Sequence, residues 1–182
     1  MIVVDIETTG TSPERHAILS IGAVNFKNIQ NQFYEECRVS SYNLIDNKAL
    51  HINGFKRKNI LSKEKQSLKS SLLKFSKWIE EQNVGNFMIG HNIHFDYEFL
   101  KKAYKKNRII FPFTYRLIDI HSIAFYESLK NKENKDYFSL NSILQSLNFE
   151  KERTPHNALI GAKLETKVLY KLIYNKDIFT DL

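Results

Sequence analysis

The chain has 182 residues, of which 42% are hydrophobic and 26% charged, and its formal net charge is +7 at pH 7. This length supports one substantial hydrophobic core, so we expect a single globular domain over residues 1–182. The chain has no run of about 18 apolar residues, and its first residues lack a signal-peptide pattern, which predicts a soluble, cytoplasmic protein without a membrane partner. The single cysteine, Cys37, excludes an intramolecular disulfide and a zinc ribbon.

The first half of the chain is expected to contain three strands followed by two helices. β-branched and apolar residues predict strands at 2–6, 17–26 and 31–40, with a hairpin turn at 27–31 between the last two. A short helix is expected at 47–54, ended by Gly54, and a strongly amphipathic helix at 68–82.

The second half alternates between the two kinds of element. Strands are predicted at 86–91 and 116–120, and helices at 95–106, 121–129, 139–147 and 155–174, with a surface loop at 130–138. Asp119 is the expected N-cap of the helix at 121–129, and Pro155 suits the first turn of the last helix. This order predicts an α/β sandwich with a mixed central sheet flanked by helices.

Three acids and a histidine lie at the ends of these elements. Asp5 and Glu7 are two residues apart on the first strand, so both side chains point to the same face. A pair of solvated acids would explain them alone, but Asp96 also begins a helix after a strand, and His156 stands near the start of the last helix. Oxygen ligands of this kind suit Mg²⁺ or Mn²⁺, and two such ions with a histidine base are the parts of a phosphodiesterase.

Two lysine-rich stretches, at 56–65 and 101–108, carry much of the positive charge. Either stretch can be an ordinary solvated face. Lysines that neutralise phosphates also gain affinity for nucleic acid by releasing counterions, so contact with a polynucleotide backbone is the alternative.

Six segments, in order, resemble the DEDDh 3′→5′ exonucleases, which include the epsilon subunit of bacterial DNA polymerase III. They are "VVDIETTGTSPERHAILSIGAV", "HINGF", "GHNIHFDYEFL", "LIDIHSIA", "SLNSILQSLNFE" and "RTPHNALIGAKLETKVLYKL". The resemblance implies an RNase H-like three-layer sandwich and 3′→5′ hydrolysis of DNA or RNA with two divalent cations. It also implies a free, single-stranded 3′ end as the partner, and raises a DNA polymerase as a second partner.

The resemblance further assigns roles to individual residues. Asp5 and Glu7 would bind metal, with Asp5 bridging both ions, and Asp96 would support the second ion, while His156 would be the general base. Four residues would bind the substrate: Thr8 and Thr9 would receive the 3′-terminal nucleotide, and Asn92 and Phe95 would line the path of the preceding phosphate or base. Thr11 stands where many members carry a leucine or methionine that packs against the terminal bases. The resemblance therefore implies a different contact with these bases in this chain.

The fourth acid of the family is absent. The third segment should place an aspartate five residues after His156, and that residue is Gly161. Glu165 follows one helical turn later, either as a surface acid paired with a lysine or as a carboxylate that reaches the site. Three hypotheses remain: an exonuclease with an incomplete metal site, an inactive nucleic-acid-binding or polymerase-associated module, or a glycine local to this chain, natural or introduced to trap substrate.

Overall fold

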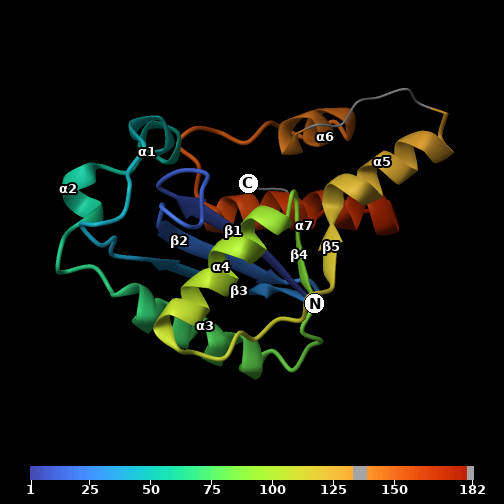
Figure 1. Ribbon diagram of the computed structural model, residues 1–182. Helices are drawn as coiled ribbons and strands as arrows, with labels where there is room; N and C mark the ends of the chain where they lie inside the picture. Colours follow the sequence, from blue (N-terminus) through green and yellow to red (C-terminus); the bar gives the residue numbers. More distant parts are fainter. Residues whose placement is uncertain (133–138, 180–182) are drawn as a thin grey trace.

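A five-stranded mixed sheet forms the centre of the molecule, in a computed structural model that describes residues 1–132 and 139–179 (Figure 1). Its strands are β1 (Ile2–Thr8), β2 (Ile18–Asn25), β3 (Asn28–Glu36), β4 (Met88–Gly90) and β5 (Leu117–Asp119), in the spatial order β3-β2-β1-β4-β5. β1, β2 and β3 pair antiparallel, whereas β4 and β5 run parallel to β1. The predicted mixed sheet is confirmed.

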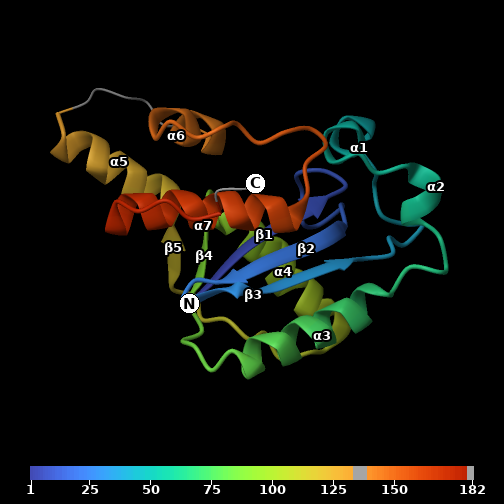
Figure 2. The ribbon, with the colours of Figure 1, turned by 180° about the vertical axis from the view of Figure 1, so that it is seen from behind.

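Helices cover both faces of this sheet, which makes the predicted three-layer sandwich. The helices are α1 (Asn47–Asn53), α2 (Arg57–Ile60), α3 (Leu68–Glu81), α4 (His94–Asn107), α5 (Ile120–Lys130), α6 (Leu140–Ser146) and α7 (Ala158–Tyr174). α3 and α4 lie on one face and α7 on the other, with α5 and α6 beside α7 (Figures 1 and 2). None of the helices within the described ranges is both long and apolar enough to cross a bilayer.

β1 lies in the middle of the sheet and divides its side chains between the two cores. Ile2, Val4 and Ile6 pack in the cluster that contains residues of α3 and α4. Val3 packs in the other cluster, with residues of α7. Because side chains alternate along a strand, Asp5 and Glu7 continue the Val3 face and point toward α7.

Glycine on β2 lets α7 approach the sheet closely. Gly22 pairs with Asp5 across β1 and β2, and a Cβ atom at Gly22 would lie 2.1 Å from the backbone carbonyl carbon of Ala158. Any larger residue would push the start of α7 outward, so the close approach depends on the missing side chain. The first turns of α7 are thereby held directly over Asp5.

Several predicted boundaries are wrong. The last helix begins at Ala158, because the Asn157 side chain caps it by accepting hydrogen bonds from the N–H groups of Leu159 and Ile160. Pro155 and His156 therefore lie in the connection before the helix. The third strand begins at 28 rather than 31, so the hairpin turn is shorter than predicted, and α2 was not predicted.

Other predicted boundaries hold. Gly54 ends α1 in the left-handed conformation, with φ of 69°. Asp119 caps α5 by accepting a hydrogen bond from the His121 N–H. The surface loop predicted at 130–138 falls largely on residues 133–138, which lie outside the described residues.

Candidate metal centre

The acid pair on β1 faces α7. Glu7 is 7% exposed and pairs with Ser20 of β2, while Asp5 is partly buried and pairs with Gly22. The two carboxylates repel each other, as does any like-charged pair out of bulk water. The two acids share one face of β1 as predicted, but the strand extends to Thr8, so Asp5 lies in its middle and only Glu7 lies near its end.

Asp96 joins this pair from the first turn of α4. Its Oδ1 accepts a hydrogen bond of 3.0 Å from the backbone N–H of Ile6, the residue between Asp5 and Glu7. The side chain is 4% exposed. Asp96, about 90 residues further along the chain, is therefore held beside Asp5 and Glu7 of β1, close enough to repel both.

Gly161 packs against the Asp5 carboxylate. A Cβ atom at Gly161 would lie 2.1 Å from Asp5 Oδ2 and 2.9 Å from Asp5 Cγ. The Asp5 side chain thus occupies the space that a side chain at 161 would need. A glycine inside a helix costs roughly 1 kcal/mol relative to alanine, and here it makes room for a functional carboxylate.

Glu165, one turn further along α7, is not a surface acid. It is 3% exposed, so the interpretation that it pairs with a lysine at the surface is wrong. Its Oε1 accepts a hydrogen bond of 2.9 Å from the His91 N–H, just after β4, while Oε2 has no hydrogen-bond partner among the described residues. Helical spacing alone predicted the shared face with Gly161, but not the burial.

His156 lies at the rim of the acid cluster, beside an acid that the sequence analysis missed. Glu152 Oε2 is 3.7 Å from His156 Nδ1, and the ligand atoms of Glu7, Glu152 and His156 all lie within 4.8 Å of one another. His156 donates its backbone N–H to the carbonyl of Ile52 at 3.0 Å, which ties the connection to α1. The only signal for Glu152 in the sequence was an acid four residues before the histidine. In a loop, this spacing does not determine where the side chain points.

Burial makes these acids hard to ionise. Burial, followed by repulsion from Glu152 and Asp96, raises the pKa of Glu7 to about 8. Burial also raises the pKa of Asp96 to about 8, although its hydrogen bond with Ile6 opposes the shift. The pKa values of Asp5 and Glu165 are raised well above their usual range, first by burial and next by repulsion, from Glu165 for Asp5 and from Asp96 for Glu165.

The donor set fits a hard divalent cation. Glu7 and Glu152 offer carboxylate oxygens and His156 a ring nitrogen within 4.8 Å of one another, and the buried Glu165 Oε2 has no hydrogen-bond partner among the described residues. Mg²⁺ and Mn²⁺ prefer oxygen ligands, and a cation favours the charged form of each acid around it.

We expect the metal-free protein to lose stability as the pH rises. A carboxyl group whose pKa is raised by folding contributes stability below its unfolded pKa, near 4, and this contribution is lost as the pH rises through its folded pKa, about 8 for Glu7 and Asp96. Urea unfolding in EDTA from pH 5 to pH 9 measures this, and saturating Mn²⁺ should flatten the loss. A free energy of unfolding that rises with pH in EDTA would contradict the buried-acid arrangement.

The four residues expected to bind substrate fall into two pairs. Thr8 and Thr9 are buried, and the Thr9 hydroxyl donates to the Leu44 carbonyl at 2.7 Å and accepts from the Ala17 N–H. Asn92, between β4 and α4, and Phe95, in the first turn of α4, are exposed. The buried threonines thus stabilise the loop after β1. Asn92 and Phe95 form the exposed surface beside the acids.

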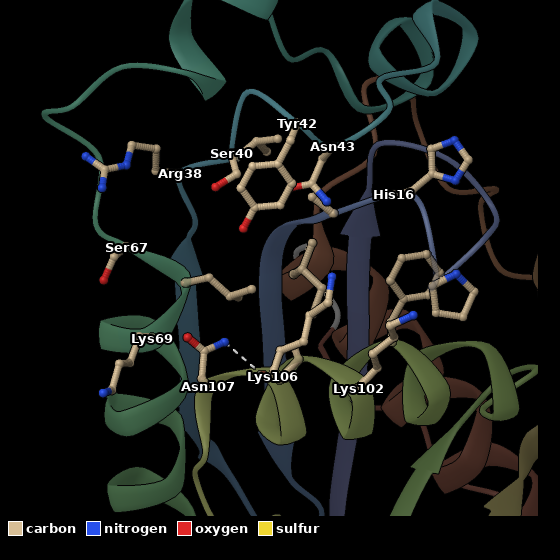
Figure 3. Close-up of a pocket in the computed structure, with 17 residues that line it drawn as sticks. His16, Arg38, Ser40, Tyr42, Asn43, Ser67, Lys69, Lys102, Lys106 and Asn107 are labelled. Carbon is tan, nitrogen blue, oxygen red and sulfur yellow. Dashed lines mark hydrogen bonds between the residues drawn. The ribbon is translucent and has the colours of Figure 1, made fainter.

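A cavity with basic side chains lies between α4 and the loops that follow β1 and β3. Figure 3 shows Lys106 rising from α4 toward Tyr42 and Asn43, Lys102 next to it on the side of His16, and Arg38 and Lys69 at the other side. Lys102 also forms an ion pair with Glu14. The lysine-rich stretch at 101–108 therefore contributes to a concave surface as well as to a solvated helix face.

The fold is shared by solved nucleases that are 12–17% identical to this chain. One is the nuclease domain of 3′hExo, a DEDDh family member bound to rAMP, with a TM-score of 0.76 over 97% of this chain and 92% of that one. Another is E. coli Exonuclease I in complex with an oligonucleotide, with a TM-score of 0.74 over 96% of this chain and 41% of that one. A third is cell-death related nuclease 4, with a TM-score of 0.77 over 97% of this chain and 64% of that one. The architecture is the RNase H-like fold of DEDDh exonucleases.

The sequence itself identifies the family. The sequence model of the RNase_T family, described as "Exonuclease", matches residues 2–169, and the chain belongs to this family. DNA polymerase III PolC-type of Thermotoga maritima is 26% identical over 172 residues, which are 94% of this chain and 12% of that protein. Ribonuclease T of Buchnera aphidicola is 29% identical over 119 residues, 59% of this chain and 55% of that protein. The chain therefore spans only a small part of its PolC-type relatives.

Proposed function

We propose that residues 1–182 form one exonuclease domain that hydrolyses DNA or RNA from the 3′ end with two divalent cations, Mg²⁺ or Mn²⁺. The observation that carries this proposal is the placement of Asp96 beside Asp5 and Glu7 of β1, with His156 at the rim of the cluster. Membership of the exonuclease family supports the same reaction.

The acids hold the cations in this proposal. Asp5 and Glu7 bind metal from β1, and Asp96, fixed by the Ile6 N–H, binds from α4. Bound divalent cations at such a site polarise the phosphate and lower the pKa of a coordinated water. The buried walls strengthen these charge interactions because they exclude bulk water.

His156 is the proposed general base. An unperturbed histidine titrates near neutral pH, which suits a group that must accept a proton from water. Glu152, whose Oε2 lies 3.7 Å from Nδ1, is proposed to hold the ring in place. The side chain of His156 is 31% exposed, so the accepted proton can pass from the ring to solvent afterwards.

The substrate is a polynucleotide whose 3′ end lies against the acids. Asn92 and Phe95 are proposed to contact the preceding nucleotide, Thr8 and Thr9 to shape the seat of the terminal one, and the basic cavity of Figure 3 to bind backbone phosphates. The PolC-type and Ribonuclease T relatives support DNA and RNA respectively.

The proposal also includes a protein partner and a cellular compartment. The PolC-type relatives support a DNA polymerase as a partner that presents the 3′ end. The compartment that we propose is the reducing cytoplasm, with which the buried free thiol of Cys37 is consistent.

The retained cluster of acids argues against an inactive binding module, since burying these acids costs stability unless a cation binds.

The test uses 5′-labelled single-stranded DNA and RNA with either a free or a blocked 3′ end. We expect a ladder that shortens by one nucleotide at a time from the free end, in Mg²⁺ or Mn²⁺ and not in EDTA. The blocked substrate should persist. No release in either metal, or cutting that ignores the block, would overturn the proposal, and a parallel Asp5→Ala preparation reports any contaminating nuclease.

A further inference from the structure

We propose that Glu165 supplies the fourth carboxylate of the metal centre, in place of the side chain that is absent at Gly161. This inference rests on the proposed function, because it assigns one more ligand to the same cation site. Its support comes from the position of Glu165, from the contact between Gly161 and Asp5, and from the chemistry of the groups around them.

The Glu165 side chain is positioned as a metal ligand that binds through one of its two carboxylate oxygens would be. It is 3% exposed, and the His91 N–H donates to Oε1 at 2.9 Å. Oε2 is buried and has no hydrogen-bond partner among the described residues. This oxygen lies close to the strand edge, 3.3 Å from where a Cβ of Gly90 would be. An ionised carboxylate oxygen left in this way costs free energy unless something positive binds it.

The groups nearest to Glu165 provide no such positive charge. Its strongest charge interactions are repulsive and come from Asp96, Glu152 and Asp119, and it is also the largest source of repulsion on Asp5. None of the ion pairs found among residues 1–132 and 139–179 includes Glu165. A divalent cation between Glu165 and Asp5 would satisfy both carboxylates.

The glycine at 161 and the glutamate at 165 are both explained by one arrangement of the metal ligands. A side chain at 161 and the present Asp5 carboxylate exclude each other, since only 2.1 Å would separate the Cβ from Oδ2. Moving the acid one turn along α7 shifts its backbone by about 5.4 Å, and glutamate has one more methylene than aspartate with which to reach back. Glycine at 161 then leaves Asp5 in place while Glu165 contributes the charge.

Mn²⁺ binding to the metal-free protein tests this assignment without relying on catalysis. Titration calorimetry or electron paramagnetic resonance should show affinity at least about tenfold weaker for Glu165→Gln than for the unaltered protein, as expected for loss of a group that holds the metal. Glu81→Gln is the matched control, because Glu81 is exposed and lies on α3, across the sheet from α7. Melting temperatures in EDTA report folding, and Glu165→Gln should be at least as stable as the unaltered protein there.

The outcomes separate the two proposals. If Glu165→Gln binds Mn²⁺ as the unaltered protein does while Asp5→Asn does not, the metal centre stands and the role of Glu165 is wrong. If the unaltered protein neither binds Mn²⁺ nor releases nucleotides, the proposed function itself fails.

A second comparison tests whether positions 161 and 165 substitute for each other. Gly161→Asp in the Glu165→Gln background should recover Mn²⁺ affinity, whereas Gly161→Asp alone should bring no gain, because Asp5 must move and Glu165 already fills the role. The two changes are then strongly non-additive. An equal gain from Gly161→Asp in both backgrounds would show that the site simply lacks an acid, and would overturn the inference.

Discussion

Replacing Asp5 with asparagine should abolish nucleotide release while leaving the fold intact. The Asp5 carboxylate packs against Gly161 of α7, and it is repelled by the carboxylates around it, which are those of Glu165, Asp96, Glu7 and Glu152. Metal ions supply several kcal/mol of charge stabilisation, and each 1.36 kcal/mol is about tenfold in rate, so we expect a loss on the order of a thousandfold or more. Single-turnover release from a 3′-labelled oligonucleotide measures the loss.

The Asp5→Asn protein should also bind Mn²⁺ much more weakly. Its melting temperature in EDTA should be equal to or higher than that of the unaltered protein, because asparagine cannot take on the buried charge that Asp5 acquires as the pH rises. Glu81→Gln provides the control for a neutralised acid outside the cluster. A variant that keeps its Mn²⁺ affinity and its rate would show that Asp5 is no metal ligand.

Replacing His156 with glutamine should lower the rate of hydrolysis by about 10²–10⁴, the usual contribution of a general base. Because His156 lies at the rim of the acid cluster, we expect the affinity for Mn²⁺ to stay within a few-fold of the unaltered value. Rates under saturating Mn²⁺, measured beside Mn²⁺ titrations of the same preparation, separate these two effects.

The alternative for His156 is a role as a ligand. Its ring nitrogen and the carboxylates of Glu7 and Glu152 lie within 4.8 Å of one another, a spacing that a metal could also bridge. In that case His156→Gln would lower Mn²⁺ affinity and rate together, and saturating metal would restore much of the rate. That result would contradict the assignment of His156 as the base.

Much of the fold followed from short-range patterns in the chain. The continuous apolar run at β1 predicted a strand buried on both faces, and the alternation of side chains placed Asp5 and Glu7 together. The start of α7 was less predictable, because Pro155 is a good first-turn residue while Asn157 caps the helix with its side chain. The sequence analysis used Pro155 as the start signal, and the hydrogen bonds accepted by the Asn157 side chain show that the helix begins later.

The least predictable part of the site was the meaning of Glu165. Its distance from Gly161 in sequence fixed the helix face, but burial depends on how closely α7 packs on the sheet, and this is set by Gly22 on β2. Glu152 was missed for a similar reason, since a loop residue has no periodicity that would aim it at His156. Contacts between distant segments, rather than local pattern, decided both.

A crystal structure of the protein soaked with Mn²⁺ and bound to a short single strand, with anomalous scattering used to locate the ions, tests the account most directly. We predict anomalous peaks at the end of β1, with carboxylate oxygens of Asp5 and Glu7 as ligands and Glu165 Oε2 turned to the same ion as Asp5. Peaks absent from this cluster, or an ion on Asp5 with Glu165 still bound only to the His91 N–H, would contradict it.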